Sequence, residues 1–432
     1  MKIQINHIAK MEGHADFVAE ILRGDVQSAK IMTTEGARLI EGILIGRHFS
    51  EAPIITSRIC GICPVVHKLS SIKAIENGLQ IKPSQQTVKL RKLLELAQII
   101  HSHALHLFFL SLADFFDLES DLQLIKKYPK ETDSAIKTRD WALKIIKIIG
   151  GRAVHPIACE VGGFKILPQI SELKNLNSQY QTVLKDALVL VNLVTKIKIP
   201  DFQRPTTYIS LTDDKEYAIY HGDIKIHSAD GKIKIIKAAD FTKNIKEIEE
   251  PYRAAKSARL NGRPFMVGAL ARLNNNHSQL NHLAKGILKS WRWDFPEYNP
   301  FKNILGQAVE IIHCLEEAQK LIVDLADNLQ PEKGLGEKLN LIAGANPLGR
   351  EVAGADAIEA PRGTLYHYYK IDKNGYIRDC QIITPTVSYL KNLEEDLAAY
   401  LPDLMKLPPP KRSIKIRALI RAYDPCIACA TH

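Results

Sequence analysis

Two cysteine pairs at opposite ends of the chain constrain its fold more than any other feature. Cys60 and Cys63 are separated by two residues near the front, and Cys426 and Cys429 repeat that spacing close to the end. A two-residue spacer lets both sulfurs of a pair reach one metal ion, and thiolates are soft ligands. If the four sulfurs meet, the fold must close a loop of nearly the whole chain. The pattern therefore predicts a fold built around a metal.

The spacing alone does not identify that metal. Two such pairs most often hold structural zinc, so a zinc-stabilised, non-catalytic scaffold subunit is one interpretation. Zinc knuckles usually close short loops in small domains, whereas this chain is 46% hydrophobic over 432 residues and does not need a metal to supply its core. His67 and His432 follow the two pairs and suit a role as ligands or as donors to the sulfurs. A redox-active metal centre is therefore the stronger hypothesis.

Composition and charge argue against several functional classes. The formal net charge is +10, but the basic residues are scattered and no nucleic-acid motif accompanies them, so we expect a solvated surface or docking of an acidic electron carrier. Seven cysteines without a signal peptide favour a reducing, cytoplasmic setting. No stretch reaches about 18 uninterrupted apolar residues, so we expect no membrane span. Cys159, Cys314 and Cys380 lack cluster spacing, so we expect no iron–sulfur cluster on this chain.

The order of helix and strand signals predicts an α+β fold that is predominantly helical. A small antiparallel sheet is expected at the N-terminus, where apolar residues alternate, and further β-hairpins are expected later, one of them around Asp230-Gly231. No linker or repeat divides the chain, so residues 1–432 are predicted to form a single cooperative unit. Its expected parts are a β-rich start (1–50), a helical core with the first cysteine pair (51–200), a β-rich insertion (201–240), and a helical and hairpin part that ends in the second pair (241–432).

Individual elements can be placed from the same signals. Strands are expected at 2–8, 15–21 and 26–33, helices at 36–46, 66–78, 84–116, 132–150, 171–196, 243–260, 278–293 and 301–329, and hairpins within 206–237 and 364–383.

The cysteine motifs match a known family. Arg58-Ile-Cys-Gly-Ile-Cys-Pro-Val-Val-His67 together with Asp424-Pro-Cys-Ile-Ala-Cys-Ala-Thr-His432 resembles the catalytic large subunit of nickel–iron hydrogenases. Further matching segments span nearly the whole chain: Lys10-Met-Glu-Gly-His14, Glu41-Gly42, Gly150-Gly-Arg-Ala-Val-His-Pro156, Glu359-Ala-Pro-Arg-Gly363 and Thr384-Pro-Thr386. The resemblance implies the large-subunit fold and reversible cleavage of H2 into protons and electrons. The motifs look most like the cytoplasmic, cofactor-coupled group, either the NAD(P)-coupled sulfhydrogenases or the F420-non-reducing hydrogenases of methanogens.

The resemblance also implies a nickel–iron centre that carries carbon monoxide and two cyanides on iron. Cys60 and Cys426 correspond to terminal nickel thiolates, and Cys63 and Cys429 correspond to thiolates that bridge nickel and iron. His67 corresponds to a hydrogen-bond donor toward a bridging sulfur.

Other residues are assigned roles around that centre by the same resemblance. Arg362 would sit above the metals, held by Asp114 and Asp424. Pro361 and Thr386 would contact the cyanides. Glu12 would take protons from the Cys426 thiolate, and a carboxyl with a burial-raised pKa suits that task. The family usually has an arginine where this chain has Lys10, two residues before that glutamate.

A magnesium ion is implied near the C-terminus, held by Glu41, His432 and the backbone carbonyl of Ile382. Family members are often made with a C-terminal extension that is later removed, which would account for an end at His432. Electrons must leave through iron–sulfur clusters, so a small-subunit partner is implied, with further diaphorase or electron-transfer subunits. The resemblance makes His103 and His106 packing residues and not a second metal site.

Overall fold

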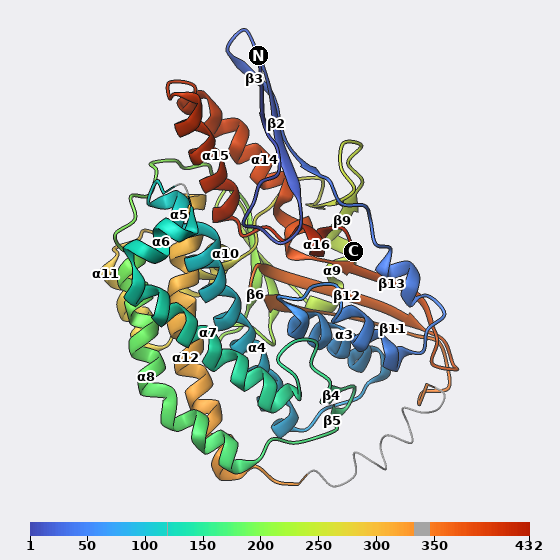
Figure 1. Ribbon diagram of the computed structural model, residues 1–432. Coiled ribbons are helices and arrows are strands. Elements are labelled where there is room, and N and C mark those ends of the chain that lie inside the picture. Colours follow the sequence, from blue (N-terminus) through green and yellow to red (C-terminus); the bar gives the residue numbers. More distant parts are fainter. Residues whose placement is uncertain (119, 332–345) are drawn as a thin grey trace.

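Four long helices form a bundle in the computed structural model, which describes residues 1–118, 120–331 and 346–432 (Figure 1). They are α4 (Gln85–Leu105), α7 (Pro129–Gly150), α8 (Ile170–Val194) and α12 (Asn303–Asn328). Both α4 and α8 pack against α7 and α12. Local signals fix their ends: Ser84 caps α4 by accepting from the backbone N–H of Thr87, and Gly151 ends α7 in the left-handed conformation. The predicted long helices are therefore confirmed.

The longest helical run changes geometry halfway along. After α4 the chain forms a π-helical segment, η2 (His106–Ser111), and then the short helix α5 (Leu112–Phe115). By length and mean hydropathy the run Gln85–Phe115 is long and apolar enough to cross a membrane, but 83% of its most apolar window is buried inside the molecule. Packing in the core therefore accounts for its apolar composition.

A three-stranded antiparallel sheet lies beside the bundle (Figure 1). Its strands are β11 (Val352–Ala360), β12 (Gly363–Ile371) and β13 (Ile377–Ile383), and α3 (Pro64–Leu79) packs against β11 and β12. The hairpin within 364–383 is confirmed, but β11, which makes it a sheet, was not predicted. Because α3 begins directly after the first cysteine pair, this packing brings that pair to the turn between β11 and β12.

The two ends of the chain also meet. The N-terminal strands β1 (Lys2–Ile5), β2 (Ala15–Leu22) and β3 (Asp25–Thr33) form the predicted antiparallel sheet, which packs through β3 on α14 (Pro385–Leu404). Beyond α15 (Pro409–Ala422), the last short helix α16 (Ile427–Ala430) is tied to the front of the chain, because the N–H of Ile427 donates to the carbonyl of Glu12 at 2.6 Å.

One predicted helix is wrong. Residues 243–260 form the end of α9 (Phe241–Asn244) and a hairpin of β9 (Ile245–Ile248) and β10 (Ser257–Leu260). Pro251 interrupts the helical pattern, and Arg253 in the connecting loop is buried against Glu394 of α14 at 2.6 Å. Tertiary contacts with α14 therefore override the local helix preference of this segment.

The remaining described elements are short or lie on the periphery. They are α1 (Ile40–Leu44), η1 (Phe49–Glu51), α2 (Ala52–Thr56), α6 (Asp121–Lys127), β4 (Cys159–Glu160), β5 (Gly163–Phe164), β6 (Tyr208–Thr212), β7 (Asp223–His227), β8 (Ile233–Ile236), η3 (Ala238–Asp240), α10 (Ala269–Asn276), η4 (His277–Gln279), α11 (His282–Ser290) and η5 (Pro300–Lys302). The strands β6, β7 and β8 form a sheet within residues 201–240, where a β-rich part is expected.

Candidate metal centre

Both cysteine pairs lie at the N-termini of helices, in similar local structures. Cys63 is the residue before α3, and Cys426 is the residue before α16. In each pair the first sulfur accepts a backbone N–H: Cys60 Sγ accepts from Ile62 and Cys426 Sγ accepts from Cys429, both at 3.3 Å. These bonds fix the direction of the sulfurs before any metal binds.

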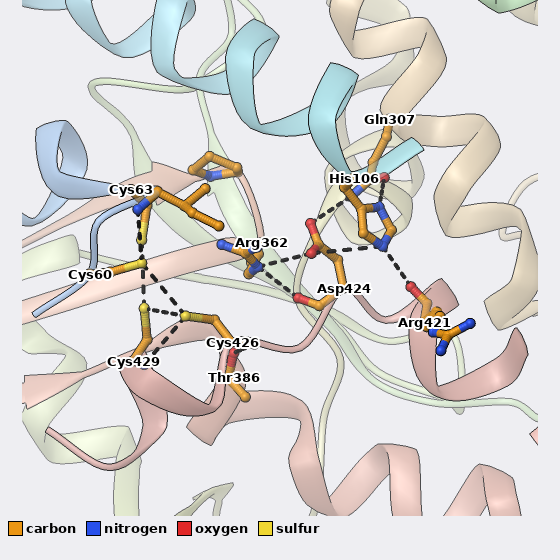
Figure 2. A network of polar contacts seen from close by, with 12 residues as sticks. Cys60, Cys63, His106, Gln307, Arg362, Thr386, Arg421, Asp424, Cys426 and Cys429 are labelled. Carbon is orange, nitrogen blue, oxygen red and sulfur yellow. Dashed lines mark hydrogen bonds and ion pairs between the residues drawn. The ribbon is translucent and has the colours of Figure 1, made fainter. Parts of the chain in front are cut away.

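The four sulfurs form one buried cluster (Figure 2). Cys60 Sγ lies 3.7 Å from Cys426 Sγ, and Cys63 Sγ lies 3.5 Å from Cys429 Sγ. Cys426 and Cys429 are 2.8 Å apart, and all four are free cysteines. The sequence therefore predicted correctly that the two ends bring their sulfurs together.

Such a cluster needs a cation to become fully anionic. Hydrogen bonds from the neighbouring thiols hold the pKa of Cys60 well below its usual value, whereas burial raises the pKa of Cys426 and Cys429. The Cys60 thiolate therefore forms readily, whereas the Cys426 and Cys429 thiols resist ionisation. Metal ions supply the missing positive charge, since a bound metal deprotonates its thiol ligands.

Arg362 lies in the turn between β11 and β12, beside the sulfurs (Figure 2). Its Nε donates to the backbone oxygen of Asp424 at 2.8 Å and to the Oδ1 carboxylate oxygen at 3.0 Å. Burial opposes the charge, but Asp424 and the cluster sulfurs outweigh it, so the pKa of Arg362 is raised. Its Nη1 is buried without a hydrogen-bond partner.

Asp114 does not hold Arg362 as predicted. Its carboxylate pairs with Arg421 of α15, and the described contacts of Arg362 come from Asp424. Arg421 is also anchored by the carbonyl of Ala9, so it ties the π-helical region to the N-terminal segment.

A small cavity lies on one side of the cluster. It is lined by Cys63, His67, Ala360, Pro361, Arg362, Leu365, Pro385, Thr386 and Cys429. Neither Cys60 nor Cys426 lines it. The second cysteine of each pair therefore lies in the cavity wall and the first does not, which matches the division expected between bridging and terminal thiolates. The unpartnered Nη1 of Arg362 is a donor in its wall. The donor set and the cavity therefore fit a metal with small ligands on this side.

Two further residues border this cavity. Thr386 Oγ1 accepts from the N–H of Cys426 and lies 3.1 Å from the hydroxyl of Tyr389, so it also fixes the second cysteine pair. His67 Nε2 lies 3.7 Å from Cys429 Sγ, and burial lowers the pKa of His67 to about 3. His67 is therefore a neutral imidazole in contact with one sulfur.

Glu12 is joined to the cluster through the backbone. Residues Glu12 and Cys426 form a parallel bridge, and the Glu12 side chain is partly buried. Burial first, and then the charge of Cys60, raise the pKa of this carboxyl. Lys10 is turned away and pairs with Asp121 at 2.5 Å. Glu12 is thus the acid placed between the sulfurs and the surface.

The three residues predicted to hold magnesium also converge. Glu41 Oε1 accepts from the N–H of Ile382 at 2.7 Å, and His432 Nε2 lies 2.8 Å from the Ile382 carbonyl. Lys256 Nζ lies 3.6 Å from Glu41 and 3.7 Å from Glu247. Sequence reasoning missed Lys256 and Glu247, because both lie in the segment that was predicted as a helix.

His103 of α4 and His106 at the start of η2 both make hydrogen bonds. His103 Nε2 lies 2.8 Å from Glu310, whose carboxylate also pairs with Arg272. His106 Nδ1 lies 2.6 Å from Gln307. These partners on α10 and α12 carry no motif that would have identified them.

Comparison with known proteins gives a consistent result. A model of the nickel-dependent hydrogenase family matches residues 38–138 and 206–432. The alpha subunit of sulfhydrogenase 1 of Pyrococcus furiosus is 32% identical, over 100% of this chain and 98% of the relative. The corresponding subunit of the F420-non-reducing hydrogenase of Methanothermobacter thermautotrophicus is 29% identical, over 100% and 95%. The solved structure of an NAD+-reducing [NiFe]-hydrogenase in its H2-reduced state matches with a TM-score of 0.89 at 23% identity, over 100% and 99% of the two chains, which confirms the predicted fold.

Proposed function

The chain belongs to the nickel-dependent hydrogenase family, and from this premise we propose how its residues serve a catalytic large subunit. The protein is a hydrogenase, an oxidoreductase that acts on H2. The zinc-stabilised scaffold is not favoured. The observation that carries the proposal is the buried four-sulfur cluster beside a guanidinium with an unpartnered N–H.

Cys60 and Cys426 would bind nickel alone, and Cys63 and Cys429 would be shared with iron. The carbon monoxide and the two cyanides of the iron would lie on the side of Cys63 and Cys429, where Pro361 and Thr386 line the small cavity. When bound, such a centre supplies the open metal position at which H2 is cleaved heterolytically.

The chain's own residues would handle the proton and the charge. The Cys426 sulfur receives a proton, and Glu12, whose pKa burial has raised, passes it toward the surface. Arg362 presents a positive charge and an N–H to the reacting side, fixed in place by Asp424. His67 stays neutral and orients the Cys429 sulfur.

Electrons would leave to a small subunit that carries iron–sulfur clusters. In the described part of the chain, the large apolar side chains of Leu39, Ile43, Ile45 and Ile54, which precede the first cysteine pair in the sequence, are exposed, and so is that of Ile157. A cleft between Ile54 and Ile157 is lined by Arg58, Lys68 and His155. An apolar surface with basic residues suits a protein interface, and a partner docked there would lie close to Cys60.

Three finer assignments complete the proposal. Glu41, the Ile382 carbonyl and His432 would hold magnesium. The enzyme would work in the cytoplasm with further diaphorase or electron-transfer subunits. Its relatives are named as sulfhydrogenase, F420-non-reducing hydrogenase and NAD-reducing hydrogenase subunits, which supports coupling to a soluble electron carrier.

Metal analysis and infrared spectroscopy of the purified complex test the centre. We expect stoichiometric nickel and iron, with carbon monoxide and cyanide bands, because a zinc scaffold has no such ligands. Cys63→Ser should lose the bands, whereas Cys314→Ser, a buried cysteine of α12 outside the cluster, should keep them. Zinc alone in the wild-type complex would refute the proposal.

A further inference from the structure

The carboxylate of Asp424, which binds Arg362, is itself contacted by two side chains from the helix bundle (Figure 2). Gln307 of α12 donates from Nε2 to Asp424 Oδ2 at 3.1 Å. His106, the first residue of η2, has its Nε2 3.7 Å from Asp424 Oδ1. All of these side chains are buried. Asp424 is therefore held by Arg362 on one side and by Gln307 and His106 on the other.

The hydrogen bonds of His106 fix its protonation. Its Nδ1 lies 2.6 Å from Gln307 Oε1, and its Nε2 lies 2.8 Å from the backbone carbonyl of Arg421. Both partners are oxygens that can only accept, so each ring nitrogen must carry a proton. If the Gln307 amide were flipped, its nitrogen could donate to His106 Nδ1. Its oxygen would then face the Asp424 carboxylate, and two acceptors in contact are unfavourable.

We propose that His106 is an imidazolium and that, together with Gln307, it positions Asp424 and through it Arg362. The protonation stands on the hydrogen bonds alone, and the catalytic consequence rests on the proposed function. A buried imidazolium needs a counter-charge, and Asp424 supplies it.

Asp424 also pairs with Arg362, but the cluster sulfurs supply Arg362 with further negative charge. Three residues before His106 on the chain, His103 meets Glu310, and Glu310 is already paired with Arg272. On α15, Arg421 is paired with Asp114. The acids of the neighbouring elements are therefore matched by their own bases.

The π-helical geometry explains how one ring reaches two elements. The switch from α4 to η2 occurs at His106, where its ring meets Gln307 on α12 and the end of α15 at once. Segments of π-helix inside α-helices often occur at functional sites. Here the segment places the proposed His106 imidazolium next to Asp424, on the side opposite Arg362.

Nitrogen NMR of the full chain labelled with ¹⁵N-histidine tests the protonation. We expect both ring nitrogens of His106 to be protonated at neutral pH. The signals are identified by their loss in His106→Gln, or by their shift in Gln307→Leu if the first variant does not accumulate. A single unprotonated ring nitrogen for His106 would overturn the assignment.

Infrared spectroscopy of the assembled hydrogenase tests the positioning role. Gln307→Leu removes both the donor to Asp424 and the acceptor of His106, so the carbon monoxide and cyanide bands should shift and H2 oxidation should fall about tenfold. Gln319→Leu makes the same change further along α12 and should leave both unaltered. If Gln307→Leu and Gln319→Leu had the same infrared bands and the same rate of H2 oxidation, the positioning role would be refuted. Absent bands in the wild-type complex would instead refute the metal centre, while the nitrogen signals still decide the state of His106.

Discussion

Single residues around the cluster respond to its negative charge in two ways. Arg362 is charged, and Asp424 fixes its direction. Glu12 lies at the partly buried edge, where burial and the charge of Cys60 raise its pKa and keep a proton available. In the proposed function, Arg362 would therefore stabilise charge that stays in the site, and Glu12 would move a proton out of it.

Glu12→Gln separates proton transfer from assembly of the centre. The amide has nearly the same shape but cannot exchange a proton, so we expect H2/D+ exchange to fall by about 10²- to 10⁴-fold with the infrared bands in place. Glu20→Gln, on the exposed side of β2, is the matched control and should exchange normally. Normal exchange in Glu12→Gln would remove this residue from the proton path.

Arg362→Lys tests geometry at constant charge. Lysine keeps the positive charge but lacks the planar guanidinium. In Arg362 that group binds Asp424 and at the same time offers a free N–H to the site. We expect turnover to drop by about 10²- to 10³-fold at unchanged nickel and iron content. Arg378→Lys, an exposed arginine paired with Asp372, should have little effect. Turnover near wild type would show that charge alone suffices.

The sequence could place most of the candidate site because its proposed ligands come in short motifs. The two-residue spacing within each cysteine pair fixes local geometry, and so does the Glu-Ala-Pro-Arg-Gly segment. The resemblance to a known family could therefore place both. The partner of Asp114 could not be predicted in this way. Three residues before Asp114 the helix is still π-helical, which changes the face on which later side chains lie, and Asp114 meets Arg421.

At the level of elements, long periodic helices were predictable and short segments were not. The bundle helices α4 and α8 carry N-terminal caps and bury an apolar face, so local sequence and packing agree. The hairpin of β9 and β10 has little local signal, and its conformation depends on burial against α14. Strand β11 was missed for a related reason, since its small residues make sense only against α3.

The contact between α3 and β11 depends on two glycines. A Cβ atom on Gly354 would lie 2.1 Å from the carbonyl of Ala74 and 2.4 Å from the N–H nitrogen of Gly78, both backbone atoms of α3. Only glycine lets the strand approach this closely. Because α3 begins next to Cys63 and carries His67, this contact also sets the position of the cluster.

Gly354→Ala should therefore separate α3 from the sheet. We expect a loss of about 1–3 kcal/mol or more in the free energy of unfolding, together with reduced metal content, as measured by urea denaturation and metal analysis. Gly286→Ala in α11 is the matched control, because a Cβ there meets no atom. That variant should be neutral or slightly more stable. Wild-type stability of Gly354→Ala would show that the strand can shift freely.

Over the whole molecule, the cluster lies where segments from distant parts of the chain meet. They are the start of α3, the turn between β11 and β12, the start of α14, and α16 (Figures 1 and 2). The buried apolar residues form one contiguous cluster from Ile8 to Ala430 that includes all four cysteines. We therefore still expect a single cooperative unit, because losing contacts at the site would also disturb the core.

This large core also buries neutral histidines, which makes stability depend on pH. Burial lowers the pKa of His101 to about 3 and that of His313 to about 4. The neutral state of His313 agrees with its geometry, because its Nδ1 accepts the N–H of Asn281 at 3.1 Å. Unfolding restores the ordinary pKa of 6.5, so below that pH the unfolded chain takes up protons that the folded chain does not.

The free energy of unfolding should therefore fall as the pH drops from 6.5 toward 4, by up to about 1.4 kcal/mol per pH unit for each such histidine. Urea midpoints measured between these pH values test this. His313→Gln keeps an acceptor for Asn281 but cannot be protonated, so its midpoint should fall less steeply with acid than that of the wild type. His282→Gln, at an exposed position on α11, should follow the wild-type curve. Identical slopes in all three proteins would mean that His313 takes up its proton without unfolding.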